Sequence, residues 1–162
     1  SRSAKAWQRI SSKPLNVLDH KHLANAARRL AADPSQPLTH WQDLGQQVSK
    51  RADKMPMRFL SPAVTALMQS PYKDAQLAKS LAFSLSQPTR FNKLDTPEDL
   101  ALTLSTLEKL TAAGAPVDTG FSRAAARAIV KLHPPRFGIR ELVSITVAWS
   151  RLVARGAAEA GR

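Results

Sequence analysis

The chain has 162 residues, 43% of them apolar, which is enough for one domain with a buried core and argues against general disorder. It has no cysteine, which excludes disulfides and cysteine-ligated zinc, and no apolar run near the roughly 18 residues of a membrane span. Lys and Arg number 24 against 12 Asp and Glu, a formal net charge of +12. This excess favours a phosphate-bearing partner such as nucleic acid, with acidic lipid and acidic protein as alternatives.

Residues 1–18 form a basic N-terminal arm that contains Arg2, Lys5, Arg9 and Lys13 and no acid. Acid-free segments rich in Ser and Arg are typical of organelle transit peptides. A basic arm that lies on RNA has the same composition. The arm is therefore consistent with both interpretations.

Helical periodicity dominates the rest of the chain, and the alternation expected of strands is absent. Leu100, Leu104 and Leu107, for example, keep the i, i+4, i+7 spacing of one helix face, and prolines mark the gaps between such segments. The pattern predicts a helical domain at residues 19–156, followed by a C-terminal tail at 157–162. The expected helices lie at residues 19–32, 38–53, 59–70, 74–86, 97–113, 119–132 and 139–156.

Residues that favour helix starts precede several of these segments. Asp19, Thr96 and Asp118 each carry a side-chain oxygen that can accept a hydrogen bond from the free amides of a first turn, so each is a predicted N-cap. Pro97 follows Thr96 at the first helical position, where the missing amide hydrogen costs least.

A leucine-led unit recurs along the chain. The units open at leucines that are 37, 40 and 42 residues apart, namely Leu23, Leu60, Leu100 and Leu142. The last two units also share an acid before the leucine and a closing glycine, Gly114 or Gly156, where a left-handed C-cap is expected. Any leucine-rich helical chain yields some such alignment, but the regular spacing favours true repeats of a leading and a second helix. We therefore predict an all-α fold of stacked helical hairpins, a short α-solenoid of about three and a half repeats.

Two of the units depart from the pattern. Pro62 falls in the first turns of the Leu60 unit, so that helix is expected to begin at Ser61. The last leading helix, at residues 139–156, should pack on the helix before it with one side, while its other side lacks a repeat partner. Another macromolecule or further chain is expected to cover that side. The apolar stripe of this last helix consists of Leu142, Ile145, Trp149 and Leu152.

The segment from Phe121 to Leu152 resembles the organellar helical repeats of octotricopeptide and heptatricopeptide proteins and of FASTK-like, RAP-domain-containing proteins. Those repeats run as a helix, a short loop, an acid–Leu opening, an alanine and tryptophan in mid-helix, and a closing Leu–Gly. The matching residues here are Glu141-Leu142, Ala148-Trp149, Leu152 and Gly156. The preceding unit matches less completely, because it has Leu107 where the pattern has tryptophan.

The resemblance implies RNA binding in an organelle, either a mitochondrion or a plastid. No RAP domain is recognisable and the repeats are few, which favours a structural component of a mitochondrial ribosome over a sequence-specific processing factor. We therefore expect a non-catalytic protein that contacts rRNA through basic helix faces, beside neighbouring proteins of a ribonucleoprotein assembly. The alternatives are a protein-binding adaptor that captures a partner helix, and a fragment of an organellar RNA-processing or stability factor.

Two basic clusters are the candidate RNA-binding sites. Arg123, Arg127 and Lys131 recur every fourth residue and so share one helix face, and arginine can grip a phosphate with two hydrogen bonds. Residues 119–155 hold seven Lys or Arg and one acid, Glu141. Ordinary solvated faces are the alternative for both clusters. The full candidate set is Arg123, Arg127, Lys131, Arg136, Arg140, Lys50, Arg51 and Lys54.

The other polar and aromatic residues predict neither catalysis nor a cofactor. His20 and His22, at i and i+2, point to different faces of a helix, so no metal site is expected there. The sequence has no phosphate-binding loop, nucleophile elbow or metalloprotease motif. Trp41 and Trp149 fall on apolar stripes and are expected in the core, whereas Trp7 either stacks on a base or anchors the arm on the protein.

Overall fold

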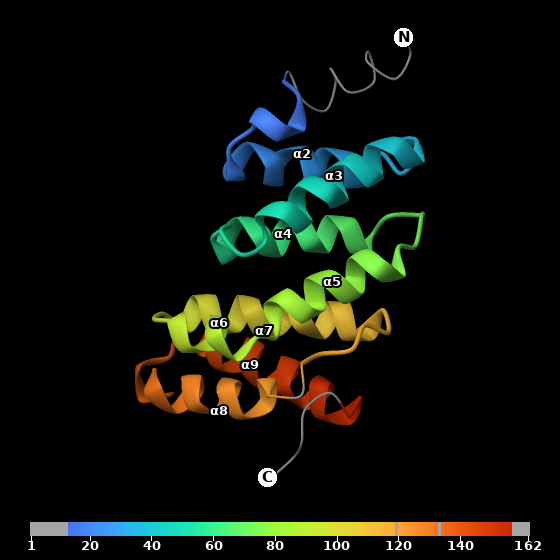
Figure 1. Cartoon of the computed structure of the whole chain (residues 1–162). Coiled ribbons are helices and arrows are strands. Elements are labelled where there is room, and N and C mark those ends of the chain that lie inside the picture. The colour runs from blue at the N-terminus through green and yellow to red at the C-terminus, as the bar shows by residue number, and fades with distance from the viewer. Residues whose placement is uncertain (1–12, 119, 133, 157–162) are drawn as a thin grey trace. The chain divides into compact units, whose positions relative to one another are not determined.

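The computed structural model describes residues 13–118, 120–132 and 134–156, and these residues form helices joined by loops, without a strand (Figure 1). The predicted all-α class of packed helical hairpins is confirmed. Contacts divide the chain into two compact units, which we call unit 1 (Ser1–Leu77) and unit 2 (Ala78–Arg162). The predicted arm up to residue 12 and the predicted tail at 157–162 lie outside the described residues.

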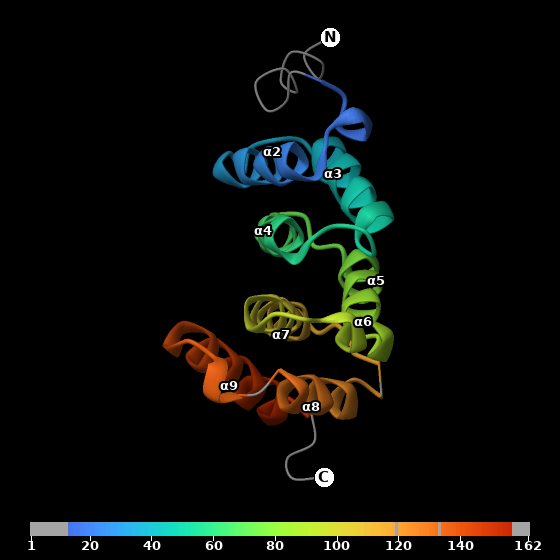
Figure 2. The same cartoon turned by 90° about the vertical axis from the view of Figure 1, so that its left-hand side faces the viewer.

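Unit 1 is a hairpin with a further helix packed on it. Its elements are the 3-10 turn η1 (Leu15–Val17), α2 (His20–Ala32), α3 (Leu38–Arg51), α4 (Met57–Met68) and the first residues of α5 (Ala75–Leu85). Helices α2 and α3 contact each other, and α4 packs against both (Figure 2). Leu23, Leu44 and Leu60, one from each helix, are completely buried and supply much of the apolar contact that stabilises the unit.

Unit 2 repeats the same plan. Its elements are the remainder of α5, α6 (Pro88–Lys93), α7 (Pro97–Ala112), α8 (Phe121–Lys131), the 3-10 turn η2 (Pro134–Arg136) and α9 (Ile139–Ala154). Helix α7 packs on α9 and α6 packs on α8, as Figure 2 shows. Helices α6 and α7 thus each contact the second helix along the chain, which is the arrangement that stacked helical hairpins produce.

The leucines that open the predicted repeats all lie on leading helices. Leu23 and Leu60 lie on α2 and α4, which pack together in unit 1, and Leu100 and Leu142 lie on α7 and α9, which pack together in unit 2. Three of the four are completely buried, but Leu142 is 42% exposed. The leucine register therefore identified the helices that stack, and the last of them keeps an apolar residue at the surface.

Two of the three predicted N-caps are confirmed. Asp19 Oδ1 accepts a hydrogen bond from the His22 amide at 2.8 Å, and Thr96 Oγ1 accepts one from the Asp99 amide at 3.2 Å. Pro97 is the first residue of α7, as its fixed φ angle and missing donor favour.

The predicted N-cap at Asp118 is wrong. Helix α8 begins at Phe121, and Gly120 precedes it without a side-chain cap. The Asp118 carboxylate instead accepts from the Gly120 amide at 2.8 Å, and the Asp118 amide donates to Ser86 Oγ at 2.8 Å. The Asp118 carboxylate therefore stabilises the loop before α8. It does not cap the helix, because it already accepts the hydrogen bond from the Gly120 amide two residues later.

Two prolines lie within helices where the sequence pattern predicts a helix start or a gap. Helix α4 begins at Met57, so the expected start at Ser61 is wrong, and Pro62 lies inside the helix. Burial of Met57 and Leu60 in the first turn compensates for the one backbone hydrogen bond that Pro62 removes. Pro88 lies between the helices expected at 74–86 and 97–113, yet it is the first residue of α6, a helix that the sequence pattern does not predict.

Left-handed glycines end α7 and α9, as predicted. Gly114 has φ +91° and Gly156 has φ +72°. After α7 the Gly114 amide donates to the Thr111 carbonyl at 2.9 Å and the Ala115 amide donates to the Leu110 carbonyl at 3.1 Å. This pair of bonds satisfies carbonyls that the helix leaves free and is the Schellman arrangement.

The packing of α9 differs from the expectation. It packs mainly on α7, not on the helix before it, and it touches α8 through Trp149, whose ring centroid lies 6.1 Å from that of Phe121. Trp149 is only partly buried, whereas Trp41 is buried as predicted, with 4% exposure. Trp7 lies outside the described residues.

Candidate nucleic-acid interface

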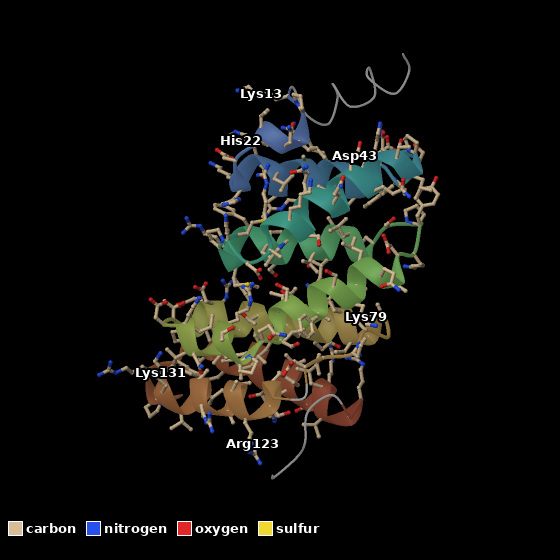
Figure 3. The ribbon with its side chains drawn as sticks, in the orientation of Figure 1. Lys13, His22, Asp43, Lys79, Arg123 and Lys131 are labelled. Atoms are coloured by element: carbon tan, nitrogen blue, oxygen red, sulfur yellow. The ribbon has the colours of Figure 1, made fainter. Side chains whose placement is uncertain are left out.

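Helix α8 presents a basic edge in unit 2. Phe121, Ala124 and Ala128 bury one face of the helix, which leaves Arg123 and Arg127 exposed on another. Figure 3 shows Arg123 pointing outward from α8. Two arginines one turn apart can contact phosphates that lie along a helix face.

Lys131 continues this edge at the end of α8 but also has a structural contact. Its ammonium group donates to the Asn92 carbonyl at 3.1 Å, which ties α8 to the last turn of α6. Lysine carries three donors, so one internal hydrogen bond leaves the exposed ammonium able to meet an anion.

Arg136 and Arg140 extend the basic residues beyond α8. Arg136 ends η2 and Arg140 lies in the first turn of α9, and both are exposed. Phe137 between them is buried and anchors the connection. The acid of this segment, Glu141, lies against Gly138 at the start of α9, where the positive end of the helix dipole favours a carboxylate.

The second predicted cluster, in unit 1, is divided between two roles. Lys50 and Lys54 are exposed at the end of α3 and in the following turn. The Arg51 guanidinium donates to the carbonyls of Leu15 at 3.0 Å and Asn16 at 3.1 Å, and also to that of Leu18. Arg51 thus holds the segment before α2 on the end of α3.

Two arginines of unit 2 lie beside Glu108, an acid outside the predicted sites. Arg155 Nη1 donates to Glu108 Oε1 at 2.6 Å, and Arg151 Nη1 lies 4.0 Å from the same oxygen. The Glu108 side chain is only 11% exposed, so this pairing helps to join α7 to α9. No local signal could have found it, because the partners are more than 40 residues apart in the chain.

Three aromatic residues of unit 2 pack together in its interior. Phe91 of α6 and Phe121 of α8 lie with their ring centroids 6.2 Å apart, and Trp149 contacts Phe121 in turn. These tilted ring pairs stabilise the packing of the three helices. These three rings therefore do not form a row of open faces on which bases could stack.

Two histidines of unit 1, His22 and His40, have structural partners. His22 Nδ1 lies 2.6 Å from Asp19 Oδ1, and His40 is buried with its Nδ1 3.0 Å from Gln36 Oε1. The hydrogen bonds from the His22 amide and imidazole hold the pKa of Asp19 below its usual value. Within the described ranges no three His, Asp or Glu side chains gather as they would around a metal ion.

Comparisons with protein-family models, with curated proteins and with solved structures find no match. The similarity to organellar helical repeats therefore stays a prediction based on residues of this chain. Among the described helices, none combines the length and the apolar character needed to cross a membrane.

Proposed function

We propose that this chain is a non-catalytic RNA-binding protein of the helical-repeat type. The observation that carries the proposal is the exposed basic set of unit 2, on α8, η2 and the first turn of α9. Arg123, Arg127, Arg136 and Arg140 are exposed there, while Glu141 lies against the start of α9. Such a surface favours phosphate contact without base readout.

Lys131 in unit 2 and Lys50 and Lys54 in unit 1 are further contacts in this proposal. Arg51 is left out because carbonyls of the chain occupy its guanidinium. The net charge of +12 supports an anionic macromolecule as the partner. The resemblance of the repeat pattern to organellar helical repeats supports a structural place in a mitochondrial ribosome, with a plastid ribosome as the alternative.

The first test reverses the charge of the α8 edge. The double variant Arg123→Glu, Arg127→Glu should lower the affinity for a labelled RNA of arbitrary sequence by about tenfold or more, because phosphate attraction becomes repulsion. Fluorescence anisotropy at fixed salt measures the affinity, and circular dichroism checks that helicity is kept. Both side chains are exposed, so the fold should survive.

The matched control is Lys73→Glu, Lys79→Glu. It changes the net charge by the same amount at exposed lysines outside either basic cluster. Its affinity should fall clearly less than that of the arginine variant. Equal losses in the two variants would mean that overall charge alone matters, and an unchanged affinity of the arginine variant would remove α8 from the interface.

A further inference from the structure

Phe83 of α5 holds an aromatic ring at the surface of unit 2. The residue is 59% exposed, whereas Phe91 and Phe121 of the same unit are buried. The packing side of α5 carries other residues, among them the buried Ala82 and Leu85. The ring of Phe83 therefore contributes little to the packing of its own helix, and its faces are open to a partner.

The repeat register shows that the fold does not require an aromatic residue at this place. The 37-residue spacing of the first two repeat units also aligns α3 with α5. Buried residues coincide in this alignment, as Trp41 with Ala78, Leu44 with Leu81, Gly45 with Ala82 and Val48 with Leu85. Phe83 then corresponds to Gln46, which is also exposed. The position faces solvent in both helices, and α3 fills it with a polar side chain.

The charge beside the ring is positive. Lys79 is exposed on α5 four residues before Phe83, so the two side chains share one helix face (Figure 3). The corresponding residue of α3 is the neutral Gln42, and the acid Asp43 follows it. Residues 75–94 contain no acid at all. An anionic partner can therefore approach the ring without meeting a carboxylate of α5 or α6.

These surroundings favour a nucleobase over an apolar partner. Lys79 and Ser80 beside the ring are exposed and polar, so the ring is not part of a broad apolar patch of the kind that binds a protein helix or a membrane. A single open ring next to a cation suits a nucleotide, because the base can stack on the ring while the cation meets a phosphate. Helices precede and follow α5 in the chain, and the ring is exposed in their presence.

We propose that Phe83 stacks on an unpaired base of single-stranded RNA, with Lys79 facing the adjacent phosphate. The bases of a duplex are already stacked on their neighbours and turned inward, so a duplex cannot cover the ring in this way. Every base has a π-face, so the contact reads no sequence. The proposal rests on the RNA binding proposed above and narrows its substrate to single strands.

Stacking at Phe83 agrees with the charge-reversal test of α8. Lys79 supplies one cation beside the ring, whereas α8 supplies Arg123 and Arg127. The smaller loss of affinity expected for the Lys73→Glu, Lys79→Glu control therefore still holds. That control also keeps the ring, so it leaves the stacking contact in place.

Removal of the ring tests the contact in the full chain. Phe83→Ala should lower the affinity for a labelled single-stranded RNA about five- to tenfold, because one base loses its stacking partner. Phe83→Trp should keep the affinity within about twofold of the unchanged chain, since the larger ring also stacks. Fluorescence anisotropy measures the affinities. Circular dichroism should show the same helicity for both variants, because the side chain is exposed.

The matched control is Tyr72→Ala in unit 1. Tyr72 is also an exposed aromatic residue, at 42%, but the charges of Lys73 and Asp74 after it cancel. This variant should bind the single-stranded RNA within about twofold of the unchanged chain. Equal losses in Tyr72→Ala and Phe83→Ala would mean that no particular site on α5 is used, and would overturn the proposal.

Duplex RNA and salt separate stacking from charge. Phe83→Ala should bind a duplex of the same length within about twofold of the unchanged chain. On the single strand it should keep the salt dependence of the unchanged chain, because the substitution removes no cation. An unchanged affinity for the single strand, or an equal loss on the duplex, would overturn the proposal.

The outcomes also distinguish stacking from RNA binding as such. If Arg123→Glu, Arg127→Glu weakens RNA binding and Phe83→Ala does not, the proposed function stands and stacking is wrong. No RNA binding by the unchanged chain would contradict both. Vesicles of phosphatidylserine and phosphatidylcholine should bind the unchanged chain and Phe83→Ala equally. A selective loss of vesicle binding would assign the ring to a membrane surface and overturn the proposal.

Discussion

Gly114 shows how one residue ends a leading helix. Its φ of +91° lies in the left-handed region, which residues with a Cβ atom adopt only at a cost. A Cβ added there would meet nothing within 4 Å, so the backbone angle and not crowding requires glycine. With this angle the following amide reaches the Leu110 carbonyl and closes the helix.

Replacing Gly114 therefore measures the free-energy cost of the left-handed backbone angle without a contribution from side-chain crowding. Gly114→Ala should lower the free energy of unfolding by about 1–2 kcal/mol, and Gly114→Asn by less, because asparagine tolerates the left-handed region better. Urea denaturation followed by circular dichroism measures both. An Ala variant as stable as the unchanged protein would show that the chain ends α7 in another way.

The arginines show where prediction of the site from sequence stops. Arg123 and Arg127 were predictable as an exposed pair because helical spacing places them on one face. Arg51, Arg151 and Arg155 were not separable from them by composition or local spacing. Their oxygen partners lie more than 30 residues away along the chain, so only the folded structure shows that these guanidinium groups are used internally.

Among the elements, the leading helices were the most predictable. Within each unit two leading helices pack together, α2 with α4 and α7 with α9, and burial at these contacts favours the regular spacing of their leucines. Proline caused the two main errors, because it favours a first helical turn as well as a gap. Pro88 begins α6, and Pro62 is tolerated within α4. Only the burial of Phe91 and Leu60 beside them decides each case.

Leucine-to-alanine substitutions distinguish the buried face of α9 from its exposed face. Leu152→Ala, at a completely buried position, should lower the free energy of unfolding by about 2–5 kcal/mol through lost contact and a cavity. Leu142→Ala is the matched control at a partly exposed position of the same helix and should cost less than about 1 kcal/mol. Thermal or urea unfolding of both variants gives the comparison. Similar losses of stability would mean that Leu142 is covered within the folded chain.

At the scale of the whole molecule, the sequence predicted a charge but not its distribution. The net charge of +12 follows from composition, whereas the charge that is available at the surface depends on which Lys and Arg side chains pair with other groups of the folded chain. In unit 2 the fold gives Arg151 and Arg155 to Glu108 and leaves Arg123, Arg127 and Arg140 at the surface. The proposed phosphate contact of unit 2 follows from this distribution.

A salt titration of RNA binding tests the proposed electrostatic contact most directly. The affinity of the full chain for several unrelated single-stranded RNAs is measured by fluorescence anisotropy over a range of salt concentrations. We expect the logarithm of the affinity to fall linearly with the logarithm of salt, with a slope of about −3 to −5, as for roughly four to seven neutralised phosphates. The slope should be the same for every sequence, because it depends on the phosphates contacted and not on the bases. A flat salt dependence, or no measurable binding at low salt, would contradict the proposal that this chain binds RNA.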